Sequence, residues 1–184
     1  MSEETRKRIV EAAARVLARN GVASTSVKDI AAEAGVAPGL VHYYFRTKEE
    51  LVAAAVEAGC PPPVWPEVDD PTEAARLAFE QSKLAPDART RLFQSLFLEM
   101  LGPATRMEAV RETLLRSVDA ERSKIEAAAR AVIAQRGDEW SPDDAPAIAA
   151  VVWAASFGIN VQRQLDPGFD VNAAVDVLTQ LVLR

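Results

Sequence analysis

Apolar residues recur at steps of three and four along nearly the whole chain, and glycine or proline interrupts the pattern repeatedly. This spacing places the apolar side chains on one face of a helix, whereas a half-buried strand requires strict alternation. Residues 4–19 follow the pattern, with Ile9 and Leu17 on one face and a helix stop at Asn20 and Gly21. The chain is therefore predicted to be all-α.

Two short helices with their own start and stop signals follow the first one. Ser26 can cap a helix that begins at residue 27, and Asp29 stands where the partner in a capping box belongs. Gly35 can end that helix in a left-handed conformation, and Pro38 suits the first turn of the next helix. The sequence thus predicts two helices joined by a short turn.

A proline-rich stretch marks the predicted domain boundary. Thr47 and Glu50 form another capping signal, which opens a helix that runs through about residue 58. The sequence GCPPPVWPEVDDP then excludes a helix near residues 60–71. We predict one domain over residues 1–59 and a second over residues 60–184. Further helical stretches are expected at residues 72–84, 87–101, 104–136, 142–164 and 171–183.

Composition excludes several classes of protein. The chain has 184 residues, 49% of them hydrophobic, so it can bury a sizeable core. One cysteine and one histidine supply neither an intramolecular disulfide nor the usual zinc sites. No run of eighteen apolar residues exists and the charged start is not a secretory signal, so no membrane span or membrane partner is expected. We predict a cytoplasmic protein with no metal and no cofactor.

The formal net charge of −6 is unevenly distributed. Residues 1–59 carry eight Lys or Arg and eight Asp or Glu, whereas residues 60–184 carry thirteen and nineteen. All of the excess negative charge therefore lies in the second domain, which phosphate groups would repel. The neutral first domain can still present a basic face if its acidic side chains point elsewhere.

Residues 38–45 predict a helix with two different sides. Helical spacing places Val41, Tyr44 and Phe45 together on a buried side. The opposite side offers a bare backbone, an imidazole, a phenol and a guanidinium, from Gly39, His42, Tyr43 and Arg46.

Two helices joined by a short turn, the second exposing polar aromatic side chains, indicate a helix-turn-helix. In that motif the second helix enters the major groove of DNA with its N-terminal residues at the base edges. Polar aromatic side chains can donate to phosphates or base acceptors, and leucine can touch a thymine methyl group. The backbone amides in the first turns of the helices that open near residues 27 and 48 can bind anions such as phosphates, and lysines lie beside them. The predicted DNA contacts are Ser26, Val27, Lys28, Pro38, Gly39, Leu40, His42, Tyr43, Arg46 and Lys48.

The stretch TRKRIVEAAARVLARNGVASTSVKDIAAEAGVAPGLVHYYFRTKEELVAAAVE resembles the N-terminal DNA-binding domain of the TetR family of bacterial transcriptional regulators. The resemblance is continuous over residues 5–57 and includes NG, TSVKDIAAEAGV, the aromatic helix ending in YYF, and KEEL. Two positions differ, because His42 stands where the family often has Tyr and Ala37 where Ser often caps the helix. The resemblance implies a three-helix helix-turn-helix domain that binds a double-stranded DNA operator.

The same resemblance implies that the second domain binds a small-molecule effector and forms a homodimer. The ending NVQRQLDPGFDVNAAVDVLTQLVLR is similar to that of regulators of the choline-repressor type. Aromatic and methionine side chains line ligand cavities, although they more often fill a core. The candidate pocket residues are Phe93, Phe97, Met100, Met107, Trp153 and Phe157.

Residues 145–159, APAIAAVVWAASFGI, are apolar nearly all round, so a helix there must be buried on more than one side. Together with the last helix, it fits the family's four-helix dimer interface, and an internal core helix is the alternative. The predicted interface residues are Ala150, Ala154, Gly158, Val171, Val175, Leu178 and Val182.

Three functions from different classes remain open at this point. The first is a dimeric repressor released from a palindromic operator by a small apolar effector. The second is a DNA-binding regulator without a ligand, whose C-terminal core is filled. The third is an enzyme, for which neither a phosphate-binding glycine loop nor a Gly-x-Ser-x-Gly elbow is present. At the chain start, Arg6, Lys7 and Arg8 form either an arm toward phosphate or a solvated helix end.

Overall fold

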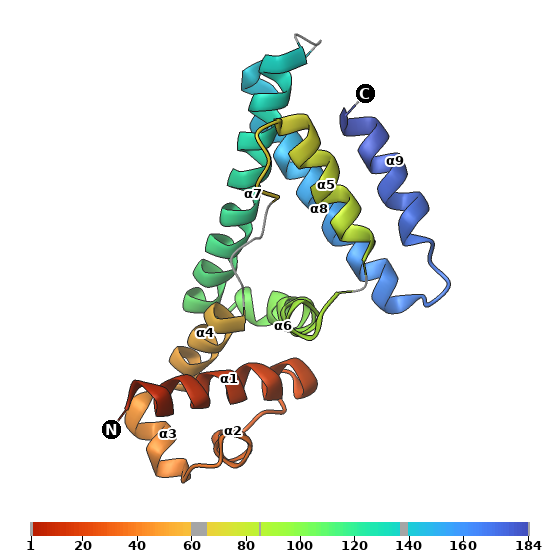
Figure 1. Cartoon of the computed structure of the whole chain (residues 1–184). Coiled ribbons are helices and arrows are strands. Elements are labelled where there is room, and N and C mark those ends of the chain that lie inside the picture. Colours follow the sequence, from red (N-terminus) through yellow and green to blue (C-terminus); the bar gives the residue numbers. More distant parts are fainter. Residues whose placement is uncertain (1, 60–65, 85, 137–139, 184) are drawn as a thin grey trace. The chain divides into compact units, whose positions relative to one another are not determined.

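The computed structural model describes residues 2–59, 66–84, 86–136 and 140–183. These ranges are helical, as Figure 1 shows, and the predicted all-α class is confirmed. The first four helices are α1 (Glu3–Asn20), α2 (Val27–Ala34), α3 (Pro38–Tyr44) and α4 (Lys48–Gly59). They are followed by α5 (Pro71–Lys83), α6 (Ala88–Ala104), α7 (Glu108–Arg136), a 3-10 turn (Pro142–Asp144), α8 (Ala145–Leu165) and α9 (Val171–Leu183).

The predicted helix caps are present. The Ser26 hydroxyl accepts a hydrogen bond from the Asp29 N–H at 3.2 Å, and the Asp29 carboxylate accepts one from the Ser26 N–H at 2.8 Å. Gly35 ends α2 with a φ of 64°, the left-handed conformation that glycine adopts most easily. The Thr47 hydroxyl accepts from the Glu50 N–H at 3.0 Å and so caps α4. Local capping chemistry therefore sets these helix boundaries.

The first compact unit consists of Met1–Pro61 and Asp87–Ser117. Within it, α1 lies against α2, α4 and α6. Its interior contains Ile9 and Leu17 of α1, Leu51 of α4 and Met100 of α6, each at most 1% exposed. Helix α6 is thus part of the same core as the four N-terminal helices. The predicted boundary near residues 60–71 begins outside the described residues and stays a prediction.

Helix α6 approaches the end of α4 closely. A Cβ atom added to Gly59 would lie 2.7 Å from Cδ2 of Leu96. Glycine at this position therefore permits α6 to pack directly against the end of α4, which a larger residue would prevent without a shift of Leu96.

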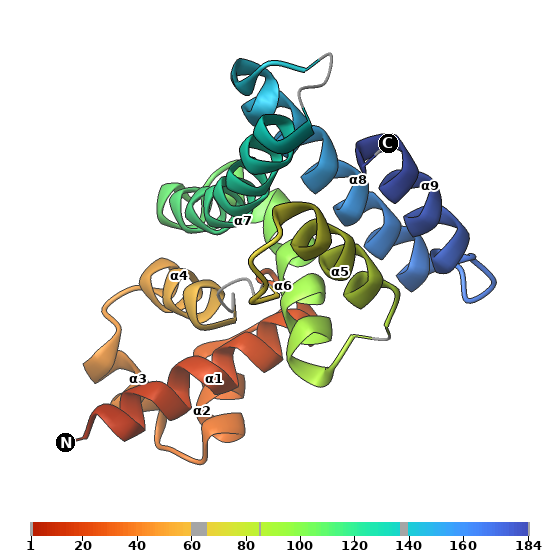
Figure 2. The same cartoon turned by 45° about the horizontal axis from the view of Figure 1, so that its top comes forward.

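The second compact unit consists of Pro62–Pro86 and Val118–Arg184. Helix α9 packs against both α5 and α8, and Figure 2 shows it beside α8. Phe79, Val152, Val175 and Leu178 form its core, and Ile125 of α7 packs against them. Charged side chains tie the same helices together at the surface. The Lys83 ammonium lies 2.5 Å from the Asp176 carboxylate, and the Arg163 guanidinium donates to the Leu84 carbonyl at 3.0 Å.

The core of the second unit includes residues of the predicted dimer interface. Val175 and Leu178 are 2% and 8% exposed, so this chain's own α5 and α8 already cover them. Val171 and Val182 also pack against that core. The apolar stripe of α9 thus packs within the chain, and contact of these residues with a second copy stays a prediction.

One helical segment of the second unit carries much exposed apolar surface. Residues Pro142–Leu165 are long and apolar enough to cross a membrane by length and composition, and only 17% of the most apolar window is buried. The sequence contains no unbroken run of eighteen apolar residues, but this helix qualifies by its mean hydropathy and its low number of charged residues. A single helix of this kind is weak evidence for a membrane, since helices that pack against other protein surfaces have the same composition.

Candidate nucleic-acid interface

Helices α2 and α3 are joined by a turn of three residues. At the end of α2, the Gly35 N–H donates to the Ala32 carbonyl at 3.1 Å and the Val36 N–H donates to the Ala31 carbonyl at 2.9 Å. These bonds satisfy carbonyl groups that the last helical turn leaves unpaired. Pro38 occupies the first turn of α3, where its missing N–H is not needed. The predicted helix-turn-helix geometry is therefore present.

Helix α3 has the two predicted sides. Val41 and Phe45 are 1% and 2% exposed and anchor the helix to the interior of the unit. Tyr44, predicted to be buried with them, is only half-buried, because its hydroxyl reaches the Ser2 carbonyl at 3.2 Å. The residues predicted for the opposite side are exposed: Gly39, His42, Tyr43 and Arg46.

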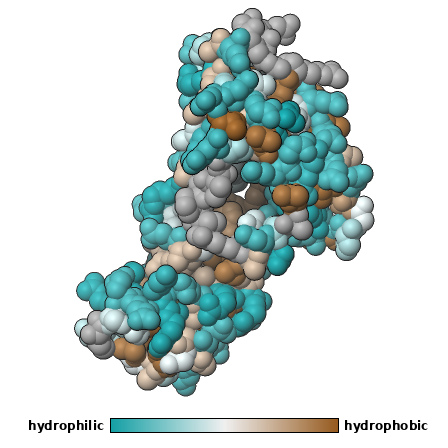
Figure 3. Space-filling model, in the orientation of Figure 1, coloured by the Kyte–Doolittle hydropathy of each residue, from teal (hydrophilic) through white to brown (hydrophobic). Residues whose placement is uncertain are grey.

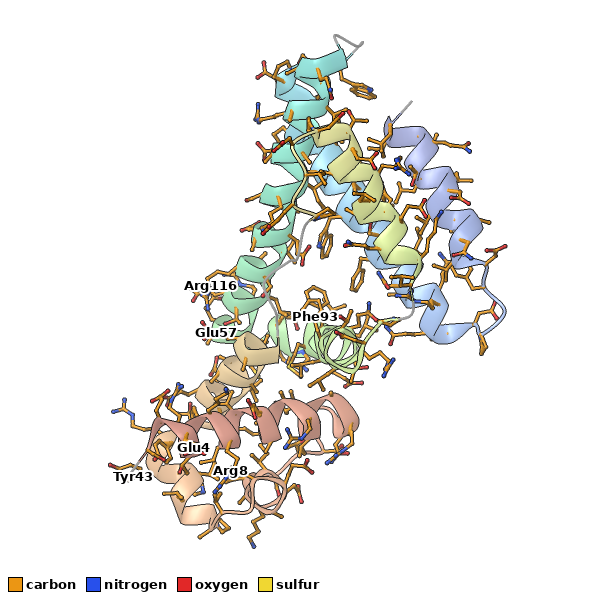
Figure 4. The ribbon with its side chains drawn as sticks, in the orientation of Figure 1. Glu4, Arg8, Tyr43, Glu57, Phe93 and Arg116 are labelled. Atoms are coloured by element: carbon orange, nitrogen blue, oxygen red, sulfur yellow. The ribbon has the colours of Figure 1, made fainter. Side chains whose placement is uncertain are left out.

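Tyr43 is the most exposed aromatic side chain on α3. Its side chain is 67% exposed and points away from the protein, as Figure 4 shows. Its ring meets that of Tyr44 edge to face, with 5.3 Å between centroids. This contact orients the Tyr43 phenol while its hydroxyl stays accessible to a ligand.

Gly39 is not required by the fold of the protein. Its φ is not positive, and a Cβ atom added there would meet no atom within 4 Å. Glycine near a helix start also confers more backbone freedom on the unfolded chain than alanine does. The residue thus leaves a bare patch of backbone on the exposed side of α3.

The lysines and caps beside α3 complete the predicted interface. Lys28 and Lys48 are exposed, and the Lys48 ammonium donates to the Val22 carbonyl at 2.6 Å. Ser26 is exposed, but its hydroxyl donates to the Asp29 carboxylate at 2.6 Å. Hydrogen bonds from the Ser26 side chain and backbone lower the pKa of Asp29. A carboxylate therefore already occupies the start of α2, which weakens that helix end as an anion site.

Two arginines that the sequence analysis did not single out fix α1 against α2. The Arg15 and Arg19 guanidiniums each donate to the Glu33 carboxylate at 2.9 Å. Hydrogen bonds from Arg19 and then Arg15 lower the pKa of Glu33. The partners are far apart in sequence, so helical spacing alone could not pair them. This contact holds the first helix of the helix-turn-helix in place.

Hydrophilic residues dominate the visible surface of the first unit, whereas hydrophobic residues reach the surface at several places on the second (Figure 3). This distribution suits a polar ligand for the first unit. The charges and polar groups gathered on α3 and beside it are of the kind that contacts phosphates and base edges.

The six candidate pocket residues divide between the two units. In the first, the Phe93 and Phe97 rings meet with centroids 5.8 Å apart, and Phe97 and Met100 are 5% and 0% exposed. In the second, Trp153 and Phe157 stack nearly parallel, 5.4 Å apart and 5° from coplanar. Met107, in the first unit, is half-buried. Contact of these residues with an effector stays a prediction.

Residues 9–55 match the family described as bacterial regulatory proteins, tetR family. The HTH-type transcriptional regulator TtgR of Pseudomonas putida is 44% identical over 57 residues, which are 31% of this chain and 27% of TtgR. The chain thus matches only about a quarter of that relative's length. Residues 9–55, which match the family model, include both α2 and α3.

Solved structures resemble the chain over nearly its full length. A transcriptional regulator from Saccharomonospora viridis, in complex with choline, has a TM-score of 0.77 at 22% identity over 96% of its chain and 98% of this one. The multidrug binding protein EbrR, complexed with ethidium, has a TM-score of 0.64 at 25% identity over 98% of its chain and 97% of this one. The chain therefore shares its fold with these two solved structures.

Proposed function

We propose that this chain, a DNA-binding transcriptional regulator of the TetR family, is a homodimeric repressor that a small apolar effector releases from a palindromic operator. Regulators of this family are not enzymes, which agrees with the sequence prediction. The proposed location is the cytoplasm, where a bacterial regulator reaches its operator DNA.

The observation that carries the proposal is the two-sided structure of α3. Val41 and Phe45 anchor one side, while Tyr43 and His42 project from the other beside the bare backbone of Gly39. A short helix held this way can enter the major groove with its N-terminal turn against base edges. Exposed lysines on α2 and α4 supply charge for phosphate contacts.

A palindromic operator requires two copies of the chain related by twofold symmetry. Exposed apolar residues on the last two helices support such a dimer, because α8 exposes Val151 and Ala154, and α9 exposes Val177 and Leu181. A Cβ atom at Gly158 of α8 would meet no atom of its own chain within 4 Å, which leaves room for a partner helix. The proposed interface therefore uses α8 and the exposed side of α9.

The proposed effector is a small molecule with an apolar, planar surface. The parallel Trp153 and Phe157 rings offer a flat aromatic platform, and aromatic faces also attract cations. The choline and ethidium bound by the two structural neighbours are both cationic, which supports a test of such compounds first. The effector acts by binding better to a dimer whose α3 helices are wrongly spaced for two half-sites. A coupling of about 1–3 kcal/mol would weaken operator binding about 5- to 150-fold.

The first experiment is selection of bound duplexes from a random DNA pool by the purified chain, at fixed salt. Enrichment of a palindrome supports a symmetric dimer that reads two half-sites. A folded dimer that enriches no sequence, with or without added cationic aromatic compounds, contradicts the proposal.

Variants of α3 separate recognition from folding. Tyr43→Ala or His42→Ala should weaken binding to the selected duplex while the melting temperature stays near that of the wild type. Phe45→Ala removes a buried ring and should destabilise the fold by about 3–5 kcal/mol. If Tyr43→Ala instead lowers the melting temperature in step with its affinity, Tyr43 is a structural residue and not a DNA contact.

The alternative is a regulator that needs no effector because its C-terminal core is filled, and Phe97 and Met100 are indeed buried. Release of the selected duplex by a small molecule, together with loss of that release in Trp153→Ala, supports the ligand-responsive function. Binding that no tested compound changes, together with a crystal structure whose core is solid, supports the alternative.

A further inference from the structure

The first turn of α1 contacts the last turn of the proposed recognition helix. The Tyr44 hydroxyl donates to the backbone carbonyl of Ser2 at 3.2 Å, across 42 positions of sequence. The Arg6 guanidinium lies over the Phe45 ring, with its central carbon 5.3 Å from the ring centroid, which is a cation–π distance. Two residues at the end of α3 are therefore held by two residues at the start of α1.

The Ser2 carbonyl is itself fixed in position. The Ser2 hydroxyl caps α1 by accepting from the Thr5 N–H, and the Ser2 carbonyl accepts from the same N–H at 3.0 Å. Arg6 follows one turn later and lies 4.0 Å from the Glu3 carboxylate. Capping therefore orders the part of α1 that contacts α3.

Helix α3 needs external support because it is short. It has seven residues, and isolated helices of fewer than about twelve residues are marginal in water. At its start it is joined to α2 by the turn at Gly35, and at its end Phe45 has already left the helical conformation. The contacts from Ser2 and Arg6 support this second end.

We propose that Arg6 and Tyr44 are positioning residues, which set the orientation of α3 for DNA reading without touching DNA themselves. The proposal rests on the proposed function, since it concerns how α3 is presented to an operator. For Arg6 the proposal replaces both interpretations of the basic chain start, because an Arg6 engaged with Phe45 is neither an arm toward phosphate nor only a solvated helix end.

Lys7 supplies a matched control for Arg6. It is the adjacent cation on the same helix, its side chain is 75% exposed, and its ammonium lies 3.9 Å from the Glu11 carboxylate. Among the described residues, the cation over the Phe45 ring is Arg6 and not Lys7. Arg6→Met and Lys7→Met therefore remove the same charge from neighbouring positions, and only the first removes the contact with Phe45. Arg6→Lys keeps a cation near the ring, and Tyr44→Phe removes only the hydroxyl.

The experiment measures binding of each variant to the duplex selected by the wild type and to a shuffled duplex of equal length, over a series of salt concentrations. Loss of one exposed cation–π contact changes an equilibrium constant by about two- to fivefold. A dimer has two recognition helices, so the effect on its binding constant for the operator is the square of that factor. Arg6→Met should thus weaken binding to the selected duplex by about 4- to 25-fold and change binding to the shuffled duplex little, with an unchanged salt slope. Tyr44→Phe should act in the same direction, whereas Lys7→Met and Arg6→Lys should bind nearly as the wild type does.

Two results would overturn the positioning role. If Arg6→Met weakens both duplexes alike and reduces the salt slope by about one per chain, Arg6 contacts a phosphate. If Arg6→Met binds both duplexes like the wild type, the contact with Phe45 does not orient α3. Failure of the wild-type chain to prefer any duplex would instead contradict the proposed function, so the two failures are distinguishable.

Discussion

The Lys48 ammonium donates to the backbone carbonyl of Val22 at 2.6 Å, which ties the start of α4 to the loop between α1 and α2. Lys48 is nevertheless exposed, so its charge can also attract a phosphate beside α3. The Lys48 side chain thus both fixes the start of α4 and adds positive charge to the proposed interface.

Lys48→Ala should weaken binding to every duplex by a similar factor and reduce the salt slope by about one per chain, because a phosphate contact carries no sequence information. Loss of the bond to Val22 should also lower the melting temperature slightly. Fluorescence anisotropy with the selected and shuffled duplexes at several salt concentrations measures the first effect. A loss confined to the selected duplex would show that Lys48 reads bases or orients α3 instead.

Gly39→Ala should stabilise the protein and weaken its binding to DNA. A Cβ atom has open space at this position and φ is not positive, so alanine gains up to about 1 kcal/mol through reduced freedom of the unfolded chain. The same methyl group would stand between the α3 backbone and the base edges. Chemical denaturation and operator titration of one preparation measure both effects. A stabilised variant that binds the operator with native affinity would show that DNA does not approach the backbone at Gly39.

Glu33 makes the stability of the first unit depend on pH. Hydrogen bonds from Arg19 and Arg15 lower its pKa in the folded state below the ordinary value of 4.5. The unfolded chain therefore takes up the proton first as pH falls, and the stabilisation is complete above the unfolded pKa and lost on passing through the folded one. Glu33→Gln should lower the melting temperature at neutral pH, and the difference from the wild type should shrink as the pH falls below 4.5 and through the lowered pKa of the folded state. A difference that is constant over this range would mean that the carboxylate charge contributes nothing.

Local signals in the sequence predicted the fold well because their causes lie within one or two helical turns. The capping box of Ser26 and Asp29 and the glycine stop at Gly35 are of this kind. Contacts between helices are different, because Glu33 with Arg15 and Tyr44 with Ser2 join residues 18 and 42 positions apart, and no periodicity pairs them. Such contacts depend on how helices pack, which the spacing of apolar residues leaves undetermined.

The last helix shows the same limit at the candidate dimer surface. The spacing of apolar residues indicated an apolar stripe that includes Val175 and Leu178. Such a stripe can pack against the same chain or against a second copy, and the spacing does not distinguish the two. In the structure the stripe faces α5 and α8 of the same chain, and Val177 and Leu181 remain exposed on the helix. On α9, the apolar residues available to a second copy therefore include Val177 and Leu181, which the predicted interface did not contain.

Val177→Glu combined with Leu181→Glu should separate the proposed dimer without unfolding the chain, because both side chains are exposed, at 57% and 72%. Leu178→Ala, on the buried side of the same helix, should instead destabilise the chain by about 2–5 kcal/mol, since it removes buried methyl groups from the core of the second unit. Analytical ultracentrifugation reports the first effect and thermal unfolding the second. The separated chains should still fold but bind a palindrome far more weakly, because each would read a single half-site. If the double variant stays dimeric at low concentration, the two copies associate through another surface.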